Sequence, residues 1–233
     1  MNAEKELENL FIKIQEIRNE DPLKAIYLID ESKKQFIAQA EINELDALRR
    51  NIEYQIKKQN LIVKTSLDTI SLINSLKNKK MDYVFMLIYN ELKNRDLKEY
   101  ASEFQYFFNG NDFDNKGFQT LIYDLLQKKE IDYDYKISEY IINPKKLGAI
   151  DENKEIKRIQ NEILSHFEKD IAKSKTASQV FAAYVFQNWL EIINQKTQND
   201  YQIIIDVIDT LLGQKDANEL QNEAKKLYEF FKK

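Results

Sequence analysis

The residues best suited to acid–base or metal chemistry lie on one predicted helix. His166 is the only histidine, and Glu162 and Asp170 stand four residues before and after it, so all three share one helical face. Such a row could hold a metal or transfer a proton. One histidine with two carboxylates on a single helix forms an open, weak site. We therefore interpret the row as a solvated flank beside Ile163 and Phe167.

Other catalytic and metal-binding arrangements are excluded by composition. The chain has no cysteine, which excludes disulfides, thiolate zinc sites, iron–sulfur clusters and a cysteine nucleophile. Without a second histidine or any cysteine, we also exclude catalytic triads and ordinary zinc sites. We predict no catalytic residues, no metal ligands and no cofactor. An enzyme built from dispersed Asp, Glu, Lys and Tyr is the third-ranked alternative, because a sequence does not show which carboxylates meet in space.

One loop has the spacing of a calcium site. Asp112, Asp114 and Gly117 match positions 1, 3 and 6 of such a loop. Position 5 would be Lys116, a cation, and position 12 would be Tyr123 in place of a bidentate Glu. We reject calcium binding and interpret Asp114 as the cap of the following helix.

Four clusters of basic residues could contact phosphates. They are Lys77-Asn78-Lys79-Lys80, Arg49-Arg50, Lys128-Lys129 and Lys145-Lys146. The net charge is −4, and lysine greatly outnumbers arginine, which binds phosphate in a bidentate manner. Carboxylates also lie close to most of these clusters. We interpret them as solvated surface, and nucleic-acid binding through lysines is the alternative function.

The elements that carry these residues are predicted to be helices. The chain of 233 residues is 43% hydrophobic and contains only 4 Gly and 2 Pro, which disfavours glycine-rich phosphate loops and hairpin arrays. The expected fold class is all-α. No stretch is apolar enough to cross a membrane, and no secretory signal is visible, so we expect a cytoplasmic protein. Abundant Lys, Ile and Asn suggest the codon usage of a low-GC bacterium.

The first domain is predicted to be a series of helical hairpins over residues 1–128. Apolar residues recur every three or four positions, which predicts helices over 7–17, 22–36, 45–56, 61–76, 85–92, 97–108 and 118–126. The second of these should begin at Asp21, with Pro22 in its first turn. Short polar loops between short amphipathic helices are typical of antiparallel pairs.

A short β-hairpin is predicted near 131–142, within a connector at 129–150. Ile and Tyr alternate with polar residues from Ile131 to Ile137, and Tyr140–Ile142 can return as the partner strand. Asn143 and Pro144 then cap and begin a single helical turn that ends at Gly148.

The last domain, 151–233, is predicted to be a helical bundle. Thr176 and Gln179 form a capping box before a helix over 180–193 that is apolar on almost every side. Such a helix should be central and covered by its neighbours, with Trp189 in the core. Gly213 should end the next helix. Asp216, with Glu219 three residues later, should cap the last one.

Two helix pairs resemble degenerate tetratricopeptide hairpins. They are LENLFIKIQEIRNEDPLKAIYLIDESKKQF and MLIYNELKNRDLKEYASEFQYFF, in which Ala25 and Ala101 match the small residue early in the second helix of that family. The Trp, the first-helix Gly and the closing Pro of the family are missing from both pairs.

A second resemblance covers the centre of the chain. The stretch LLQKKEIDYDYKISEYIINPKKL, between two helical parts, resembles a group of uncharacterised mollicute proteins related to tetratricopeptide folds, the DUF3196 type. The matching residues are Leu125, Leu126, Ile131, Asp132, Asn143, Pro144 and Leu147. The resemblance implies a helical-repeat-like fold without assigned catalytic residues.

These observations favour a non-enzymatic scaffold or adaptor. Stacked helical hairpins expose long grooved faces, and each catalytic arrangement considered above lacks a necessary residue. The expected partner is a protein or a peptide. A nucleic-acid-associated protein that uses the lysine clusters is the alternative, and no membrane partner is expected.

Overall fold

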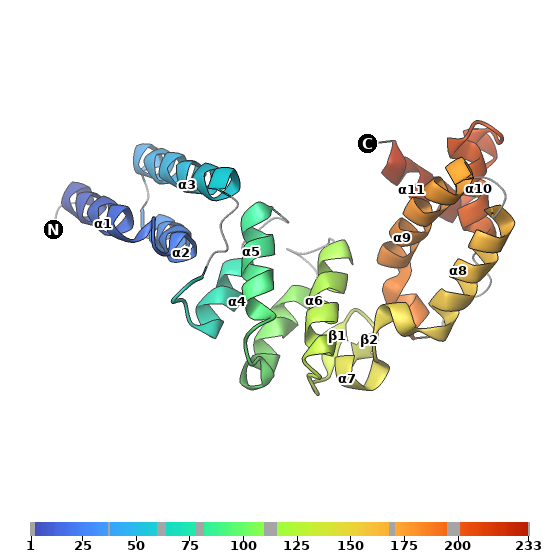
Figure 1. Ribbon diagram of the computed structural model, residues 1–233, viewed down its shortest axis with the longest axis horizontal. Coiled ribbons are helices and arrows are strands. Elements are labelled where there is room, and N and C mark those ends of the chain that lie inside the picture. The colour runs from blue at the N-terminus through green and yellow to red at the C-terminus, as the bar shows by residue number, and fades with distance from the viewer. Residues whose placement is uncertain are drawn as a thin grey trace. The chain divides into compact units, whose positions relative to one another are not determined.

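The computed structural model describes residues 3–36, 38–59, 64–77, 82–109, 116–167, 171–194 and 201–232. Within these ranges the protein is almost entirely helical, with one small β-hairpin (Figure 1). The predicted fold class, all-α with a short hairpin, is confirmed. The chain divides into two compact units, Met1–Phe104 and Gln105–Lys233.

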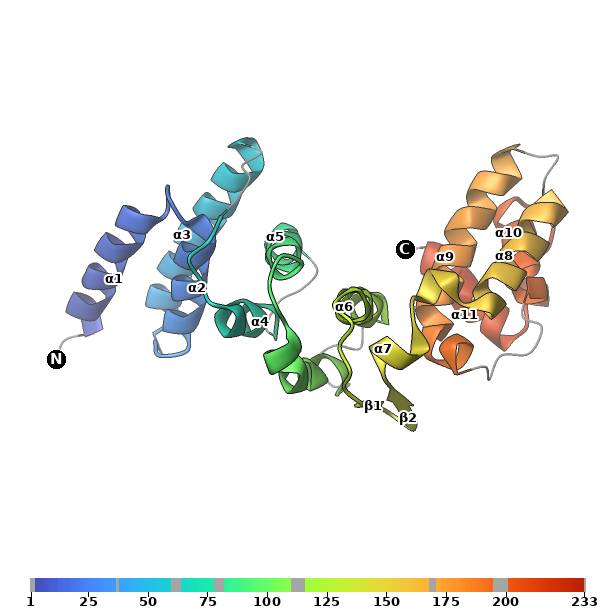
Figure 2. The ribbon, with the colours of Figure 1, turned by 60° about the horizontal axis from the view of Figure 1, so that its bottom comes forward.

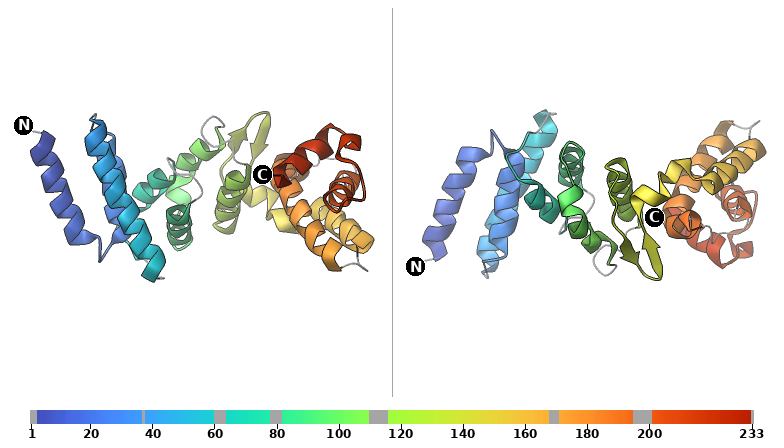
Figure 3. Two further views of the ribbon diagram at one scale, coloured as in Figure 1. Left: turned by 90° about the horizontal axis from the view of Figure 1, so that it is seen from above. Right: turned by 90° about the horizontal axis from the view of Figure 1, so that it is seen from below.

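The first unit consists of consecutive helices. They are α1 (Ala3–Ile17), α2 (Pro22–Lys33), α3 (Gln39–Gln59), α4 (Thr69–Lys77) and α5 (Tyr83–Leu92). The helix α2 packs against α1 and α3, and α4 packs against α5 (Figure 3). A 3₁₀-helix, η1 (Lys98–Phe108), crosses from the first unit into the second.

The start of α2 follows from its capping residues. The Asp21 carboxylate accepts a hydrogen bond from the Lys24 backbone N–H at 3.0 Å, and Pro22 occupies the first turn. Ala25 and Ile29 are fully buried. The predicted helix start is therefore confirmed.

The helix α4 is shorter than predicted. Residues 64–68 have no regular secondary structure, and α4 begins at Thr69. Residues 61–63, which the prediction also included, lie outside the described residues. The later start follows from Asp68, whose carboxylate accepts a hydrogen bond from the Ser71 backbone N–H at 2.8 Å in the manner of an N-cap.

The second unit combines the hairpin with a helical bundle (Figure 2). Its elements are α6 (Lys116–Lys128), β1 (Tyr135–Ile137), β2 (Tyr140–Ile142), α7 (Pro144–Leu147), η2 (Ile150–Glu152), α8 (Lys154–Phe167), α9 (Ile171–Ile193), α10 (Tyr201–Leu211), η3 (Ala217–Glu219) and α11 (Asn222–Phe231).

The β-hairpin forms at the predicted place. Strands β1 and β2 pair antiparallel, with Tyr135 opposite Ile142 and Ile137 opposite Tyr140. These four side chains are buried, and the Tyr135 ring lies 5.1 Å from that of Phe108. Packing of one face against a helix is what so short a hairpin needs for stability.

The helix α6 belongs to the second unit, whereas the sequence placed it in a first domain of residues 1–128. It packs against α7 and α9, so the connector expected at 129–150 lies inside this unit. The Tyr123 hydroxyl donates to the Gly148 carbonyl oxygen at 2.6 Å, and the Tyr123 ring lies 5.3 Å from that of Trp189. Buried aromatic packing therefore joins α6 to the C-terminal helices.

Two predicted helix starts are wrong. The helix α9 begins at Ile171, so Thr176 lies inside it, and the Ser174 hydroxyl caps the preceding helix by donating to the Phe167 carbonyl at 3.0 Å. Asp216 caps the short η3, while α11 begins only at Asn222. The Asp216 carboxylate accepts from the Asn218 N–H, so this cap serves η3 and not α11.

The helix α9 is central, as predicted. It packs against α6, α8, α10 and α11, and Trp189 is completely buried. Across the described ranges, no helix combines the length and the apolar character needed to cross a membrane.

Candidate functional site

The strongest candidate site is a groove between α8 and α9. The helix α8 buries Ile159 and Ile163 against Ala177 and Val180 of α9. Above this layer the two helices enclose a pocket of about 240 Å³. Its lining comes from Gln160, Ile163 and Leu164 of α8 and from Ala177, Ser178, Phe181 and Ala182 of α9. We call this surface the α8–α9 groove.

The groove has large walls and small residues along α9. The Leu164 side chain remains 40% exposed on the α8 wall, and Phe181 is partly buried on the α9 side. Ala177, Ser178 and Ala182 leave space between them because their side chains are short. Small residues of this kind allow another backbone to approach closely.

The exposed stripe of α9 continues from this groove. Although α9 is central, Ser178, Ala182 and Phe186 are exposed, and Phe186 is 45% exposed. Because these residues are four apart, they form a single row on the helix. A largely apolar row that includes Ala182 and Phe186 therefore remains open on this central helix.

The two helices that form the groove carry positive exposed charge: Lys157 stands three residues before the lining residue Gln160, and Lys175 three before Ser178. Among the exposed residues in the described parts of α8 and α9, the charged ones are Lys154, Lys157 and Lys175. Glu155 and Glu162 of α8 are only partly exposed, and both bind Arg158 on another face. Residues 105–233 hold 18 basic and 21 acidic residues, so this surface has the opposite sign to the unit that carries it.

A second, polar pocket lies where α9 is kinked. Asn188 leaves helical geometry at φ −118° and ψ 16°, and its side-chain amide donates to the Tyr184 carbonyl at 3.1 Å. The Lys116 ammonium donates to the neighbouring Gln187 carbonyl. The pocket measures about 390 Å³ and reaches Glu223 on α11. Its amide and ammonium groups thus satisfy carbonyls that the kink exposes.

Two members of the candidate acid–base row, Glu162 and His166, have contacts of their own. Glu162 binds Arg158 at 2.7 Å, and the exposed His166 ring packs edge-on against Phe167 at 4.8 Å. Asp170 lies outside the described residues. No three His, Asp or Glu side chains within the described ranges lie close enough to share a metal ion.

The calcium-like loop falls mostly outside the described residues. Asp112 and Asp114 belong to the part that is not described, so the proposed capping by Asp114 stays a prediction. Position 12 of the loop would be Tyr123, which is fully buried and donates to Gly148.

Several basic clusters are paired with carboxylates. Lys77 binds Glu103 at 2.7 Å and Lys128 binds Asp124 at 2.8 Å. Lys79 and Lys80 lie outside the described residues. In the other described clusters, Arg49 binds Asp30, Glu53 and Asp82, and Lys145 and Lys146 approach Asp132 and Asp134. Such pairing weakens the attraction of these groups for phosphates.

The structure brings together one polar cluster that the sequence analysis did not assemble. The buried Asn143 amide donates to Asp132 at 3.0 Å and to Asp134 at 2.7 Å, and its carbonyl oxygen caps α7. These hydrogen bonds, with Lys145 and Lys146 nearby, hold the pKa of both carboxyls below the usual range. Each group was visible in the sequence, but only the folded hairpin brings Asn143 within hydrogen-bond distance of both aspartates.

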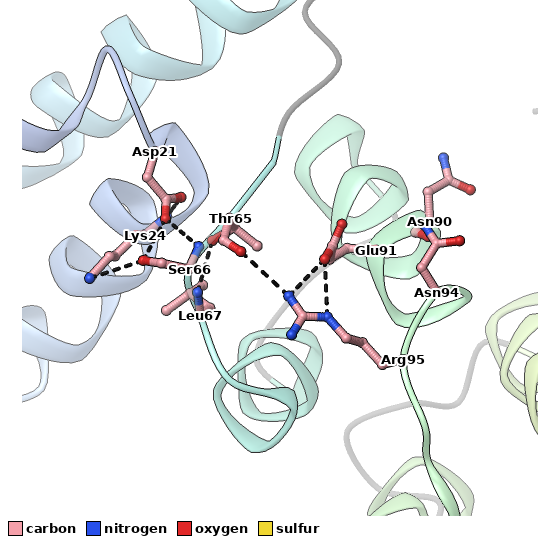
Figure 4. Close-up of polar contacts among 9 residues, drawn as sticks. All are labelled: Asp21, Lys24, Thr65, Ser66, Leu67, Asn90, Glu91, Asn94 and Arg95. Atoms are coloured by element: carbon pink, nitrogen blue, oxygen red, sulfur yellow. Dashed lines mark hydrogen bonds and ion pairs between the residues drawn. The ribbon is translucent and has the colours of Figure 1, made fainter.

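A second polar cluster holds the loop 64–68 in the first unit (Figure 4). The Asp21 carboxylate accepts from the Ser66 N–H at 2.6 Å and from its hydroxyl at 2.9 Å, while Lys24 donates to the same hydroxyl. Arg95, held by Glu91, reaches the Thr65 carbonyl at 3.4 Å. These contacts tie the segment to α2 and to the end of α5, and they are structural.

Comparisons of the chain with protein-family models, with curated proteins and with solved structures find no significant match.

Proposed function

We propose that this protein is a non-enzymatic cytoplasmic scaffold or adaptor that binds a protein or peptide partner through helical-repeat surfaces. The observation that carries the proposal is the α8–α9 groove with its open apolar row. A contiguous exposed apolar surface beside a groove is typical of a site where another molecule binds. Leu164 and Phe186 are such side chains, each at least 40% exposed.

The pairing of polar groups supports a binding role over catalysis. Glu155 and Glu162 of α8 contact Arg158. Asp132 and Asp134, before the hairpin, contact Asn143. A nucleophile needs an adjacent base and an orienting group within hydrogen-bond distance. The groove itself offers Ser178 and Gln160 as its polar side chains, which suit orientation of a bound chain.

A tetratricopeptide-like relationship is part of the same proposal. In the first unit, Ala25 is completely buried early in α2, where α2 packs against α1. A small residue at this position lets two helices approach closely, as the resemblance implies. The paired basic clusters favour a protein partner over the alternative of a nucleic acid.

The experiment is capture of partners from a host lysate with and without nuclease, using a tagged full-length chain. Ala182→Arg places a long cation across the groove, and Ala47→Arg makes the same change at another exposed helical position, on α3. We expect a stoichiometric protein with the wild type and Ala47→Arg that survives nuclease and is lost with Ala182→Arg. Equal recovery with both variants, or recovery of nucleic acid alone, would contradict the proposal.

A further inference from the structure

We infer that the α8–α9 groove binds an acidic amphipathic helix of a partner protein. The inference rests on the proposed function and names the chemistry of the partner. It depends on the shape of the groove, on the sign of the charges beside it and on the apolar row that extends from it.

The shape favours a helix. The groove runs between two packed helices, and its α9 side consists of Ala177, Ser178 and Ala182 over two turns. Short side chains there let a helical backbone approach, while the Leu164 and Phe181 walls receive apolar side chains from successive turns. Helices that dock in grooves do so through apolar residues spaced three, four and seven apart. Phe186 extends this contact surface by one further turn of α9.

The charges favour acidic residues on that helix. Lys157 stands on α8 and Lys175 on α9, so each of the two helices that form the groove contributes an exposed ammonium. Neither lysine has an ion-pair partner in the described parts of the chain, unlike Lys173, which lies within 4.0 Å of Asp209. Carboxylates on the flanks of a docked helix would complement both lysines.

The same charges disfavour other occupants. A symmetric dimer formed through this surface would offer these lysines no exposed carboxylate from the described parts of α8 or α9 of the second copy, so it would lack charge complementarity. A nucleic acid would contact the lysines but would leave Leu164 and Phe186 largely exposed, because affinity for it comes from many phosphate contacts. An acidic amphipathic helix covers the apolar residues and pairs the lysines together.

The test uses two synthetic helical peptides of about 18 residues with identical Leu and Ala positions. One carries Glu at its remaining positions and the other carries Lys, and fluorescence anisotropy measures their binding to the full-length chain at low and moderate salt. We expect the Glu peptide to bind about tenfold more tightly at low salt, with a smaller difference as salt rises. Ala182→Arg should weaken both peptides, because it obstructs the shared apolar surface.

Reversing the charge of the two groove lysines tests whether they determine the preference between the peptides. Lys157→Glu with Lys175→Glu should reverse the preference, so that the Lys peptide binds more tightly. The control, Lys58→Glu with Lys225→Glu, changes the net charge equally at exposed positions on α3 and α11 and should preserve the preference for the Glu peptide. Equal binding of both peptides, or a preference that both double variants change alike, would overturn the inference.

The remaining outcomes separate this inference from the proposed function. If neither peptide binds while the lysate partner still depends on Ala182, the acidic-helix inference is wrong and the partner-binding function stands. If the lysate partner is also insensitive to Ala182→Arg, both are wrong. Tighter binding of a single-stranded RNA, or a dimer in sedimentation that Ala182→Arg dissociates, would assign the groove to another occupant and overturn the inference.

Discussion

Tyr123 and Trp189 pack against each other in the second unit, and their polar atoms differ in hydrogen bonding. The Tyr123 hydroxyl donates to the Gly148 carbonyl, and burial raises the pKa of Tyr123 far above its usual value. The adjacent Trp189 Nε1 is buried without a partner in the described structure. An unsatisfied buried donor costs free energy, so Trp189 contributes to stability through apolar packing alone.

Substitutions at Trp189 should reflect this difference. Trp189→Ala should lower the free energy of unfolding by about 3–5 kcal/mol, because it leaves a large cavity beside Tyr123. Trp189→Phe should cost much less, since it keeps most of the apolar contact and removes the unsatisfied N–H. Chemical denaturation followed by circular dichroism measures both. A loss with Phe as large as that with Ala would show that the indole N–H is satisfied.

Asn143 should control the titration of two carboxyls. Its amide hydrogen bonds are the main cause of the lowered pKa of Asp132 and Asp134. Because these folded-state pKa values are lowered, the stabilising contribution is complete above the ordinary Asp pKa and is lost as the pH falls through the folded value. In Asn143→Ala, both pKa values should rise, as carboxyl NMR titration would show. The exposed Asn161→Ala is the control, and a similar titration in both variants would contradict this account.

Two helices end in the same hydrogen-bond pattern but with different residues. At the end of α10, the Gln214 N–H donates to the Asp209 carbonyl at 2.8 Å, and Gly213 between them has φ 72°. At the end of α6, the Ile131 N–H donates to the Leu126 carbonyl at 3.0 Å, with Glu130 in the equivalent position at φ 52°. A side chain at positive φ carries a steric cost that glycine avoids.

Glu130→Gly should therefore stabilise the protein, by about 1 kcal/mol. The substitution relieves the left-handed conformation without removing any contact that ends α6. Glu130→Ala is the matched control, because it removes the same carboxylate but keeps a Cβ, and it should bring no comparable gain. Thermal unfolding of the three proteins measures the difference. A gain with Ala equal to that with Gly would assign the effect to charge.

The sequence correctly predicted those helix ends whose capping residue and backbone partner lie close together in the chain. Asp21 before Pro22, Asn143 before Pro144 and Gly213 after a helix each fixed an end correctly, because the cap and its backbone partner are neighbours in sequence. The start predicted from Thr176 was wrong because a Thr and a Gln three residues apart also occur inside a helix. Here α9 already begins at Ile171, and Ser174 hydrogen-bonds to the end of the preceding helix. Local chemistry alone does not distinguish these cases.

The division of the chain and the groove depend on contacts that sequence patterns do not contain. The pairing of Tyr123 with Trp189 spans 66 residues, and nothing near either residue indicates the other. The exposed row on α9 could not be predicted from the sequence either. Because the helix is apolar on nearly every side, its pattern does not indicate whether Ala182 or Ala183 faces the core, and the structure buries Ala183.

Fragments of the whole molecule test the division directly, because Trp189 is the only tryptophan and reports on the contact with α6. A fragment of residues 105–233 keeps α6, so its tryptophan emission should match the blue-shifted emission of the full chain. A fragment of residues 151–233, the domain expected from sequence, lacks Tyr123 and should emit further to the red and unfold at lower temperature. Tyr123→Ala in the longer fragment should have an intermediate effect, because it removes the ring and leaves the rest of α6. Identical emission from both fragments would instead place the boundary near residue 150, with α6 in the first domain.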